Sequence, residues 1–249
     1  MSNVSISTNK LSIGYDAAVV QRDLTFSLYR GEMVCMLGPN GCGKSTLLRT
    51  LAGLQPALNG AYNLASLSSQ ASTLNSKSIA LVLTERLSLE NTTVHDVVAM
   101  GRYPYTSFLG GLTEADEQVI ADSLRQVGFG DLSVERTFFN AHSDGEKQRI
   151  LIAKALAQQT PIILLDEPTA HLDLPHRILV LRLLRNLAHE QGKTILISTH
   201  ELDLALALSD RILLMSPHAR GVQLDTAENL KKADAFTSAF GMDIFNPLG

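Results

Sequence analysis

The sequence predicts an α/β protein built on a mostly parallel sheet, and three patterns lead to this prediction. A short apolar run at 33–37 leads into the glycine-rich segment GPNGCGKST at 38–46, which a helical pattern follows. Beyond Pro161 the sequence alternates between strand and helix patterns, at 162–166, 176–190, 194–198, 201–208 and 211–215. Such alternation indicates parallel strands joined by crossover helices. Residues 4–30 instead alternate polar and apolar side chains, which predicts antiparallel strands with one solvated face.

The first part of the parallel core follows in chain order. The run at 33–37 is apolar throughout, as in a strand that is buried on both faces. Leu47, Leu48 and Leu51 recur on one side of a helix expected at 46–54. Residues 55–78 are rich in Ser, Asn and Ala and are expected to form turns with short strands. Another buried strand is expected at 79–83.

A helical subdomain is expected next, because the period of the apolar residues becomes helical from 94 to 157. Thr113 and Asp116 resemble a capping box with Asp in the acidic place. An apolar stripe follows it, formed by Val119, Ile120, Leu124 and Val127. We therefore expect one domain over 1–249, with an N-terminal antiparallel β subdomain and a helical subdomain inserted near 86–157.

Composition narrows the class of protein. The chain has 249 residues, 45% of them hydrophobic, and its net charge of −4 argues against a surface built for nucleic acid. No apolar run approaches the length of a membrane-spanning helix, and the N-terminus MSNVSISTNK lacks the regions of a signal peptide. Cys35 and Cys42 are expected to be free thiols. These features predict a soluble cytoplasmic protein.

The segment at 38–46 has the spacing of a phosphate-binding P-loop. Glycines let the backbone approach a triphosphate closely, and the amide N–H groups then face the phosphates at a helix N-terminus. Lys44 adds a positive charge for the β- and γ-phosphates, and Ser45 offers a hydroxyl for Mg²⁺. The alternative is a glycine-rich loop that binds nothing.

A second candidate site lies at the end of the strand expected at 162–166, where Asp166 and Glu167 follow four apolar residues. Such a strand delivers acids to its C-terminal edge, where α/β proteins bind ligands. The first acid suits the shell of Mg²⁺, and the second could orient or deprotonate a water molecule. The alternative is a strand that ends in a solvated turn.

Two further segments are ambiguous when each is taken alone. Ser143 is placed as a helix N-cap with Glu146 three residues later, which describes any well-capped helix. His200 follows the strand expected at 194–198 and could contact a γ-phosphate, although a lone histidine is more often a local hydrogen-bonding residue.

Taken together, the order of these four motifs resembles that of the ATP-binding cassette (ABC) ATPases over essentially the whole chain. The resemblance implies ATP and Mg²⁺ as ligands, with Ser45 and Asp166 serving the metal, Glu167 activating water and His200 holding the γ-phosphate. Tyr15 matches the aromatic residue that stacks on adenine. Asp166 and Glu167 close the Walker B motif, and 170–173 corresponds to the D-loop. The residues implied in nucleotide binding are Tyr15, Gly38, Pro39, Asn40, Gly41, Cys42, Gly43, Lys44, Ser45, Thr46, Ser143, Gly145, Glu146 and Asp173.

In this family two domains face each other head-to-tail across two ATP molecules. Each γ-phosphate lies between the P-loop of one copy and the signature motif of the other, which here contains Ser143 and Gly145. ATP therefore favours the closed pair, and hydrolysis releases it. The resemblance implies a twofold homodimer with ATP at the interface.

The sequence departs from the family pattern at three places. The signature usually reads Leu-Ser-Gly-Gly-Gln, whereas His142, Asp144 and Glu146 stand here. Asp144 is expected to face solvent and complement the helix N-terminus. The family's Gln after the 79–83 strand is absent, and either Thr84 or Glu85 occupies its place. Cys42 lies within the loop itself, where a helix N-terminus can activate a thiol, unless it is a small residue that merely fits.

The segment TVHDVVAMGRYPY at 93–105 looks like the ATPases of bacterial importers for iron-siderophores, haem and cobalamin. That resemblance implies membrane permease subunits as partners, a periplasmic binding protein acting indirectly, no nucleic acid, and a location on the cytoplasmic face of the membrane. The alternative for Arg102 and the tyrosines is packing within the insert. Competing classes are a non-transport ABC protein of DNA repair or translation, and a P-loop GTPase or small-molecule kinase, although no Asn-Lys-x-Asp motif is present.

Overall fold

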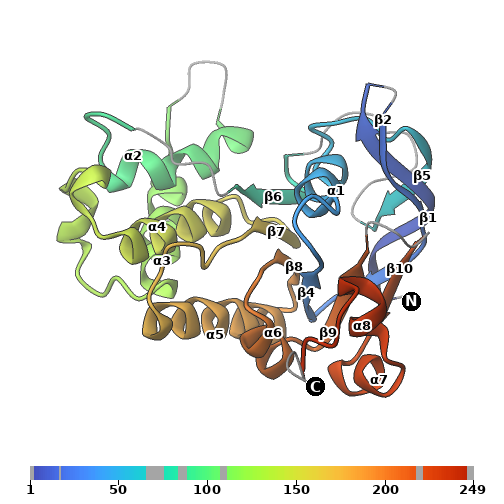
Figure 1. Ribbon diagram of the computed structural model, residues 1–249. Coiled ribbons are helices and arrows are strands. Elements are labelled where there is room, and N and C mark those ends of the chain that lie inside the picture. Colours follow the sequence, from blue (N-terminus) through green and yellow to red (C-terminus); the bar gives the residue numbers. More distant parts are fainter. Residues whose placement is uncertain are drawn as a thin grey trace.

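A computed structural model describes residues 3–16, 18–65, 76–83, 89–106, 111–216 and 221–245, and it confirms the α/β fold. Figure 1 shows a sheet through the middle of the molecule, a helical part on one side and an antiparallel β part on the other. The described part of the chain therefore has the three regions that the sequence patterns indicate.

The N-terminal β part is an antiparallel sheet arranged around one long strand. β1 (Val4–Tyr15) pairs with β2 (Ala18–Leu24), β3 (Ser27–Tyr29) and β5 (Asn59–Leu64). Ile6, Leu11 and Ile13 of β1 are fully buried, and they share a core with α1 (Lys44–Leu51). This sheet therefore packs on the helix that follows the glycine-rich loop.

In the central sheet the described strands lie in the order β10, β9, β4, β8, β7 and β6. Their bounds are Met33–Leu37 for β4, Ile79–Val82 for β6, Ile162–Asp166 for β7, Thr194–Ser198 for β8, Arg211–Met215 for β9 and Val222–Asp225 for β10. The pairs are parallel except for β10, which runs antiparallel to β9. Every residue of β4, β7 and β8 is buried, and the apolar runs at 33–37 and 162–165 predicted this for β4 and β7.

β6 and α1 show how the structure departs from the sequence predictions. The strand expected at 79–83 is present as β6, but it lies at the edge of the described sheet and only every second residue is buried. Among the described residues, β6 pairs only with β7. α1 begins at Lys44 rather than residue 46, because Gly43 adopts a left-handed conformation and serves as the N-cap. The helix ends at Leu51 rather than residue 54.

The helical insert lies between β6 and β7 in the chain. Its described helices are α2 (Val94–Ala99), η1 (Met100–Tyr105), α3 (Glu114–Gln126), η2 (Leu132–Arg136), η3 (Phe139–Ala141) and α4 (Asp144–Ala157). The capping boxes at Thr113 and Ser143 form as predicted. Ile120, Leu124 and Val127 are buried, which confirms most of the apolar stripe, while Val119 is only partly buried. The insert packs on the core chiefly through α4.

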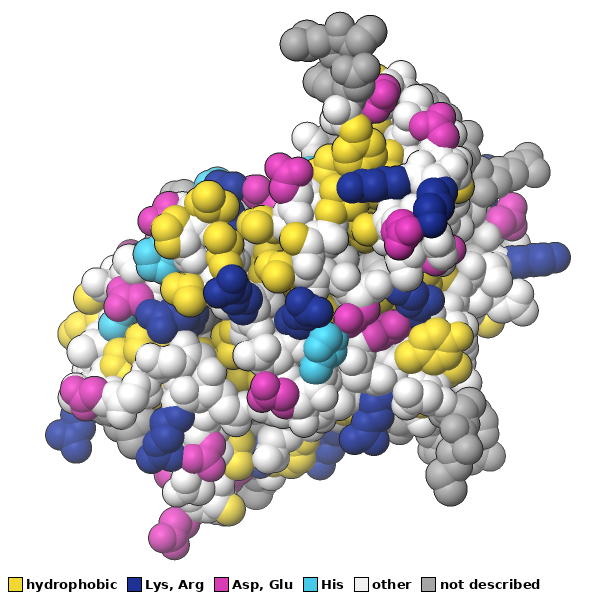
Figure 2. Space-filling model, turned by 90° about the horizontal axis from the view of Figure 1, so that it is seen from below, with side chains coloured by type: hydrophobic (Ala, Val, Ile, Leu, Met, Phe, Trp, Pro, Cys, Tyr) yellow, Lys and Arg dark blue, Asp and Glu magenta, His cyan; other side chains and the backbone are white. Residues whose placement is uncertain are grey.

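The C-terminal helices cover the lower side of the sheet in Figure 1. They are α5 (Leu174–Gln191), α6 (Leu202–Leu208), α7 (Ala227–Lys232) and α8 (Ala235–Phe240). Seen from below in Figure 2, this surface intersperses basic, acidic and apolar side chains. Within the described ranges, no helix is long and apolar enough to cross a membrane.

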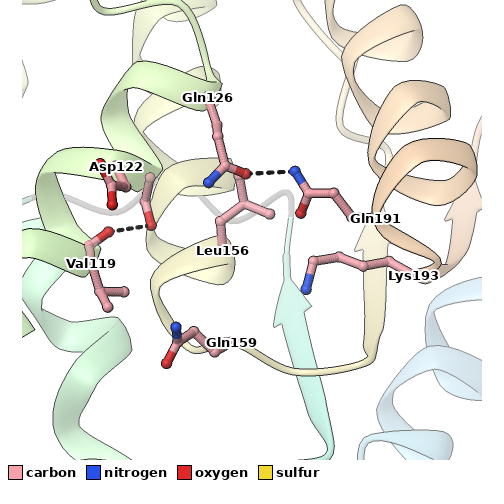
Figure 3. A pocket seen from close by; sticks show the side chains of 8 residues that line it. Val119, Asp122, Gln126, Leu156, Gln159, Gln191 and Lys193 are labelled. Atoms are coloured by element: carbon pink, nitrogen blue, oxygen red, sulfur yellow. Dashed lines mark hydrogen bonds between the residues drawn. The ribbon is translucent and has the colours of Figure 1, made fainter.

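A polar cleft of about 290 Å³ lies where the insert meets the core, between α3, the end of α4 and the end of α5 (Figure 3). Gln191 Nε2 donates a hydrogen bond to Gln126 Oε1 across it, at 2.8 Å. Lys193 Nζ donates to the Thr160 carbonyl at 2.8 Å, and partial burial lowers the pKa of Lys193. Side-chain amides thus join the two parts at this edge of the cleft.

Candidate functional site

The strand register brings three of the sequence motifs to one edge of the sheet. β8 lies between β4 and β7, with Ser198 paired to Met36 on one side and to Asp166 on the other. Thr199 N donates to the Met36 carbonyl at 3.2 Å, which continues the alignment past the strand ends. The glycine-rich loop, Asp166 with Glu167, and His200 therefore emerge side by side at the C-terminal edge.

The glycine-rich loop is shaped to receive an anion. Lys44 is only 6% exposed, and its Nζ donates to the carbonyls of Gly38 at 2.8 Å and Pro39 at 3.2 Å. α1 has no side-chain cap within the described residues, so its first N–H groups and the positive end of its dipole face the loop. Such a helix start with a lysine beside it suits a phosphate group. Asn40, Gly41 and Ser45 are exposed at this surface.

Two glycines are required where the loop passes close to neighbouring strands. A Cβ on Gly38 would lie 2.3 Å from the Met215 carbonyl oxygen, and one on Gly43 would lie 2.9 Å from Val20. Gly43 also has φ of 100°, which favours glycine. The loop is thus held between β2 and β9.

Cys42 is a packing residue in this loop. Its side chain is 1% exposed, and its Sγ would lie 2.8 Å from a Cβ on Gly38. Burial raises the pKa of Cys42, and the opposing effect of Lys44 is smaller. Cys35 is fully buried in β4, and burial raises its pKa to about 12. Both thiols are free, as predicted, but the structure favours the interpretation of Cys42 as a small residue that fits.

Ser198 organises the two acids at the end of β7. Its hydroxyl donates to Asp166 Oδ1 and accepts a hydrogen bond from Glu167 N at 2.9 Å. Glu167 has φ of 46°, in the left-handed region that residues with a side chain rarely occupy. Its Oε1 lies 2.5 Å from His200 Nε2. Asp166 is 8% exposed, whereas the Glu167 and His200 side chains are partly open to solvent.

Tyr15 joins this group from β1. Its hydroxyl accepts a hydrogen bond from Thr46 Oγ1 at 3.3 Å, and the residue is 50% exposed. The ring therefore offers an open aromatic surface beside the glycine-rich loop.

A second group of sequence-predicted residues gathers at the starts of α4 and α5. Ser143 N and Oγ both donate to Glu146 Oε2, at 3.0 and 2.8 Å, and these hydrogen bonds lower the pKa of Glu146. A Cβ on Gly145 would lie 3.1 Å from the ring of His176. His176 Nδ1 hydrogen-bonds Asp173, the N-cap of α5, and this bond lowers the pKa of Asp173. His176 thus connects the two helix starts.

The two groups are separate within one chain. Figure 1 shows α4 and α1 well apart, with β6 and β7 between them. Asp144 is exposed in the first turn of α4, as expected. Thr84 and Glu85 lie outside the described residues.

Packing within the insert explains why glycine and arginine occupy positions 101 and 102. Arg102 is 6% exposed, pairs with Asp116 at 2.8 Å and donates to the Ala157 carbonyl at 2.8 Å. A Cβ on Gly101 would lie 2.2 Å from the Lys154 carbonyl. These contacts fasten η1 to α3 and α4, which favours packing for Arg102. Tyr103 remains 62% exposed and is the aromatic residue of this segment that is free to meet another surface.

Three residues that support the site were missed by the sequence analysis. Ser198 orients Asp166 and Glu167, Gln21 donates to the loop carbonyl of Cys42 at 2.9 Å, and Arg177 contacts both Leu172 and Glu201. Gln21 and Arg177 stand in no recognised motif. Ser198 precedes Thr199 and His200, so its position at a strand end was the available signal.

The residues at the sheet edge could supply only some of the ligands of a hard cation. Ser45 and Asp166 supply oxygen atoms, which Mg²⁺ prefers. The described part of the chain contains no group of three or more His, Cys, Asp or Glu residues that could hold a metal by itself. Ligands from a bound phosphate and from water would therefore complete the shell.

Comparison with known proteins gives one consistent result. Residues 21–170 match the protein family described as ABC transporter. An uncharacterized ABC transporter ATP-binding protein of Methanocaldococcus jannaschii is 40% identical over 95% of this chain and 81% of its own length. The achromobactin transport ATP-binding protein of Dickeya dadantii is 38% identical over 92% of this chain and 85% of its own.

One solved structure extends the comparison to three dimensions. It is an inward-facing ABC transporter that is provisionally classed as metal-chelate type. Its matching chain superposes with a TM-score of 0.84 at 30% identity, over 96% of this chain and 90% of that one. The likeness therefore extends over nearly the whole length of both chains.

Proposed function

Because this chain belongs to the family of ABC transporter ATPases, we propose that its ATP hydrolysis powers the import of a metal chelate or corrinoid through a membrane permease. The observation that carries the proposal is the convergence of the glycine-rich loop, Asp166, Glu167 and His200 at one sheet edge. One relative is named for achromobactin transport, and the superposed transporter is provisionally classed as metal-chelate type, which supports cargo of that class. We also propose that residues 1–249 form a single nucleotide-binding domain.

Each residue at the sheet edge has a proposed role. Lys44 and the amide groups of 38–46 bind the β- and γ-phosphates, and Tyr15 stacks on adenine. Ser45 and Asp166 would hold Mg²⁺, which supplies charge neutralisation at the phosphates when it is bound. Glu167 accepts a proton from the attacking water, and His200 holds the γ-phosphate. In the structure His200 contacts Glu167, so bound ATP would have to share this imidazole or displace it.

We propose that the second group serves a partner's ATP. Ser143, Gly145 and Asp173 lie apart from the glycine-rich loop of their own chain, so they suit the nucleotide held by a second copy. The first turn of α4 would present its N–H groups to the γ-phosphate. ABC cassettes work as dimers with permeases, and a twofold pair of this chain would contain two such shared sites.

We propose that the permease docks on the helical insert, at the cytoplasmic face of the membrane. The exposed Tyr103 is the best anchor within 93–105, because Gly101 and Arg102 are buried in contacts within the insert. Aromatic residues of this kind are frequent anchors in protein interfaces. The periplasmic binding protein would act only through the permease.

Replacing Glu167 with Gln tests the proposed chemistry. The variant should keep ATP affinity, because the phosphate-binding loop is unchanged, and lose about 10²–10⁴ in rate, the usual contribution of a general base. ATP binding and steady-state phosphate release are the two measurements. Glu190→Gln, the same substitution at an exposed acid near the end of α5, should leave turnover nearly unchanged. Near-normal turnover in the Gln variant would contradict the role of Glu167.

A further inference from the structure

Arg177 connects two segments that the proposed function uses separately. It lies in the first turns of α5, and its Nε donates to the Leu172 carbonyl at 2.6 Å, within the 170–173 segment. Its Nη1 forms an ion pair with Glu201. One guanidinium therefore holds a carbonyl of the D-loop and a carboxylate next to His200.

Glu201 is held rigidly to His200. Its backbone N donates to Thr199 Oγ1 at 3.1 Å, and Leu202 N donates to the His200 carbonyl at 3.0 Å. Glu201 also starts α6, since Ala205 N donates to its carbonyl at 2.9 Å. Glu201 therefore lies one residue from His200 within a hydrogen-bonded turn.

The guanidinium group is suited to this connection. Its donors are coplanar and fixed in relative direction, so the two acceptors are held in one geometry. The side chains of Arg177 and Glu201 are 30% and 32% exposed, which leaves the pair partly shielded from water. Arg177 N also donates to the Asp173 carbonyl at 3.0 Å, so the arginine is anchored to the D-loop at its backbone as well.

We propose that Arg177 is a positioning residue that couples the D-loop to His200. This inference rests on the proposed function, in which a second copy contacts the D-loop and His200 holds the γ-phosphate. When the partner shifts 170–173, Arg177 moves Glu201 and sets the orientation of the imidazole. The link makes hydrolysis in one copy depend on contact with the other.

The test compares Arg177→Lys, Glu201→Gln and their double variant in the full chain. Lysine keeps the charge but cannot make both directed bonds, and glutamine removes the ion pair. Each single variant should lower kcat within the about 5- to 150-fold range of allosteric couplings, with KM for ATP within about twofold because the phosphate-binding loop is untouched. The double variant should be no slower than the slower single variant, since both changes break one link. Arg182→Lys, on an exposed position of the same helix, is the matched control and should leave kcat unchanged.

Two further measurements make the outcome decisive. Binding of a fluorescent ATP analogue and the melting temperature show whether each variant is folded, and a purely structural role would lower both together with kcat. His200→Ala separates the possible failures. If His200→Ala lowers kcat while the Arg177 and Glu201 variants keep normal turnover, the coupling is wrong. The coupling is also wrong if the kcat losses of the Arg177 and Glu201 single variants multiply in the double variant. If His200→Ala itself keeps normal turnover, the proposed role of His200 is wrong, and the coupling fails with it.

Discussion

Gln21 shows how much a single residue outside any motif can contribute to the loop. It is 3% exposed, and its Nε2 donates to the carbonyls of Cys42 at 2.9 Å and Ser216 at 2.7 Å. The side chain thus fixes the glycine-rich loop to the end of β9 from β2. Its Cγ would lie 3.3 Å from a Cβ on Gly43, so the amide is packed directly against the loop.

Replacing Gln21 with Leu should weaken both folding and ATP binding. Two buried carbonyls would lose their donor, and each such loss costs about 1–3 kcal/mol. We expect lower stability in urea and a raised KM for ATP, with a smaller effect on kcat. The same substitution at the exposed Gln118 is the control and should change stability by less than about 0.5 kcal/mol. An unchanged KM in the Gln21 variant would show that the loop keeps its shape without this contact.

At the scale of elements, the capping box at the start of α3 also anchors the insert. Asp116 accepts from Thr113 N and Oγ1 at 2.9 and 2.7 Å, and it pairs with the buried Arg102. The hydrogen bonds from Thr113, aided by Arg102, lower the pKa of Asp116 to about 2. The equivalent box of α2, formed by Thr93 and Asp96, has no such arginine among its described partners.

The pH dependence of folding stability should reveal the contribution of the Asp116–Arg102 pair. A carboxyl group with a lowered pKa in the folded state stabilises the fold above its unfolded value of 3.8, and this contribution is lost as the pH falls through about 2. Asp116→Asn should therefore unfold more easily than the native chain at pH 7, and the difference should shrink between about pH 4 and pH 2. Thermal unfolding over this range is the measurement. Asp96→Asn, which changes the more exposed box, should have a smaller effect.

Most elements could be predicted from the sequence, because their signals are local. Apolar runs predicted β4 and most of β7, the strand–helix alternation predicted β8, and the Ser143 cap predicted the start of α4. The edge position of β6 could not be predicted, since it depends on which strands lie beside it. Gln21 could not be assigned either, because a polar residue in an alternating strand is expected to face solvent. Arg102 needed the tertiary fold, which alone places η1 against α4.

At the scale of the whole molecule, the two groups of predicted site residues lie apart within one chain. The loop with Lys44 lies on one side of β6 and β7, while Ser143 and Gly145 start α4 on the other. The distance between them is set by the central sheet and the insert. If both groups act on one nucleotide, as we propose, catalysis needs a second copy of the chain.

Mixing two inactive variants tests this requirement. Lys44→Ala removes the phosphate-binding charge, and Ser143→Arg blocks the start of α4, so each variant alone should lose at least about tenfold in turnover, or about 1.4 kcal/mol. In an equal mixture half of the twofold pairs combine one copy of each, and each of these pairs regains one intact site. The mixture should then recover about a quarter of native turnover, by the statistics of an isologous pair. The measurement is ATP hydrolysis of the chain alone and of its complex with the permease. Turnover equal to the average of the two variants in both preparations would mean that each copy hydrolyses ATP within its own chain.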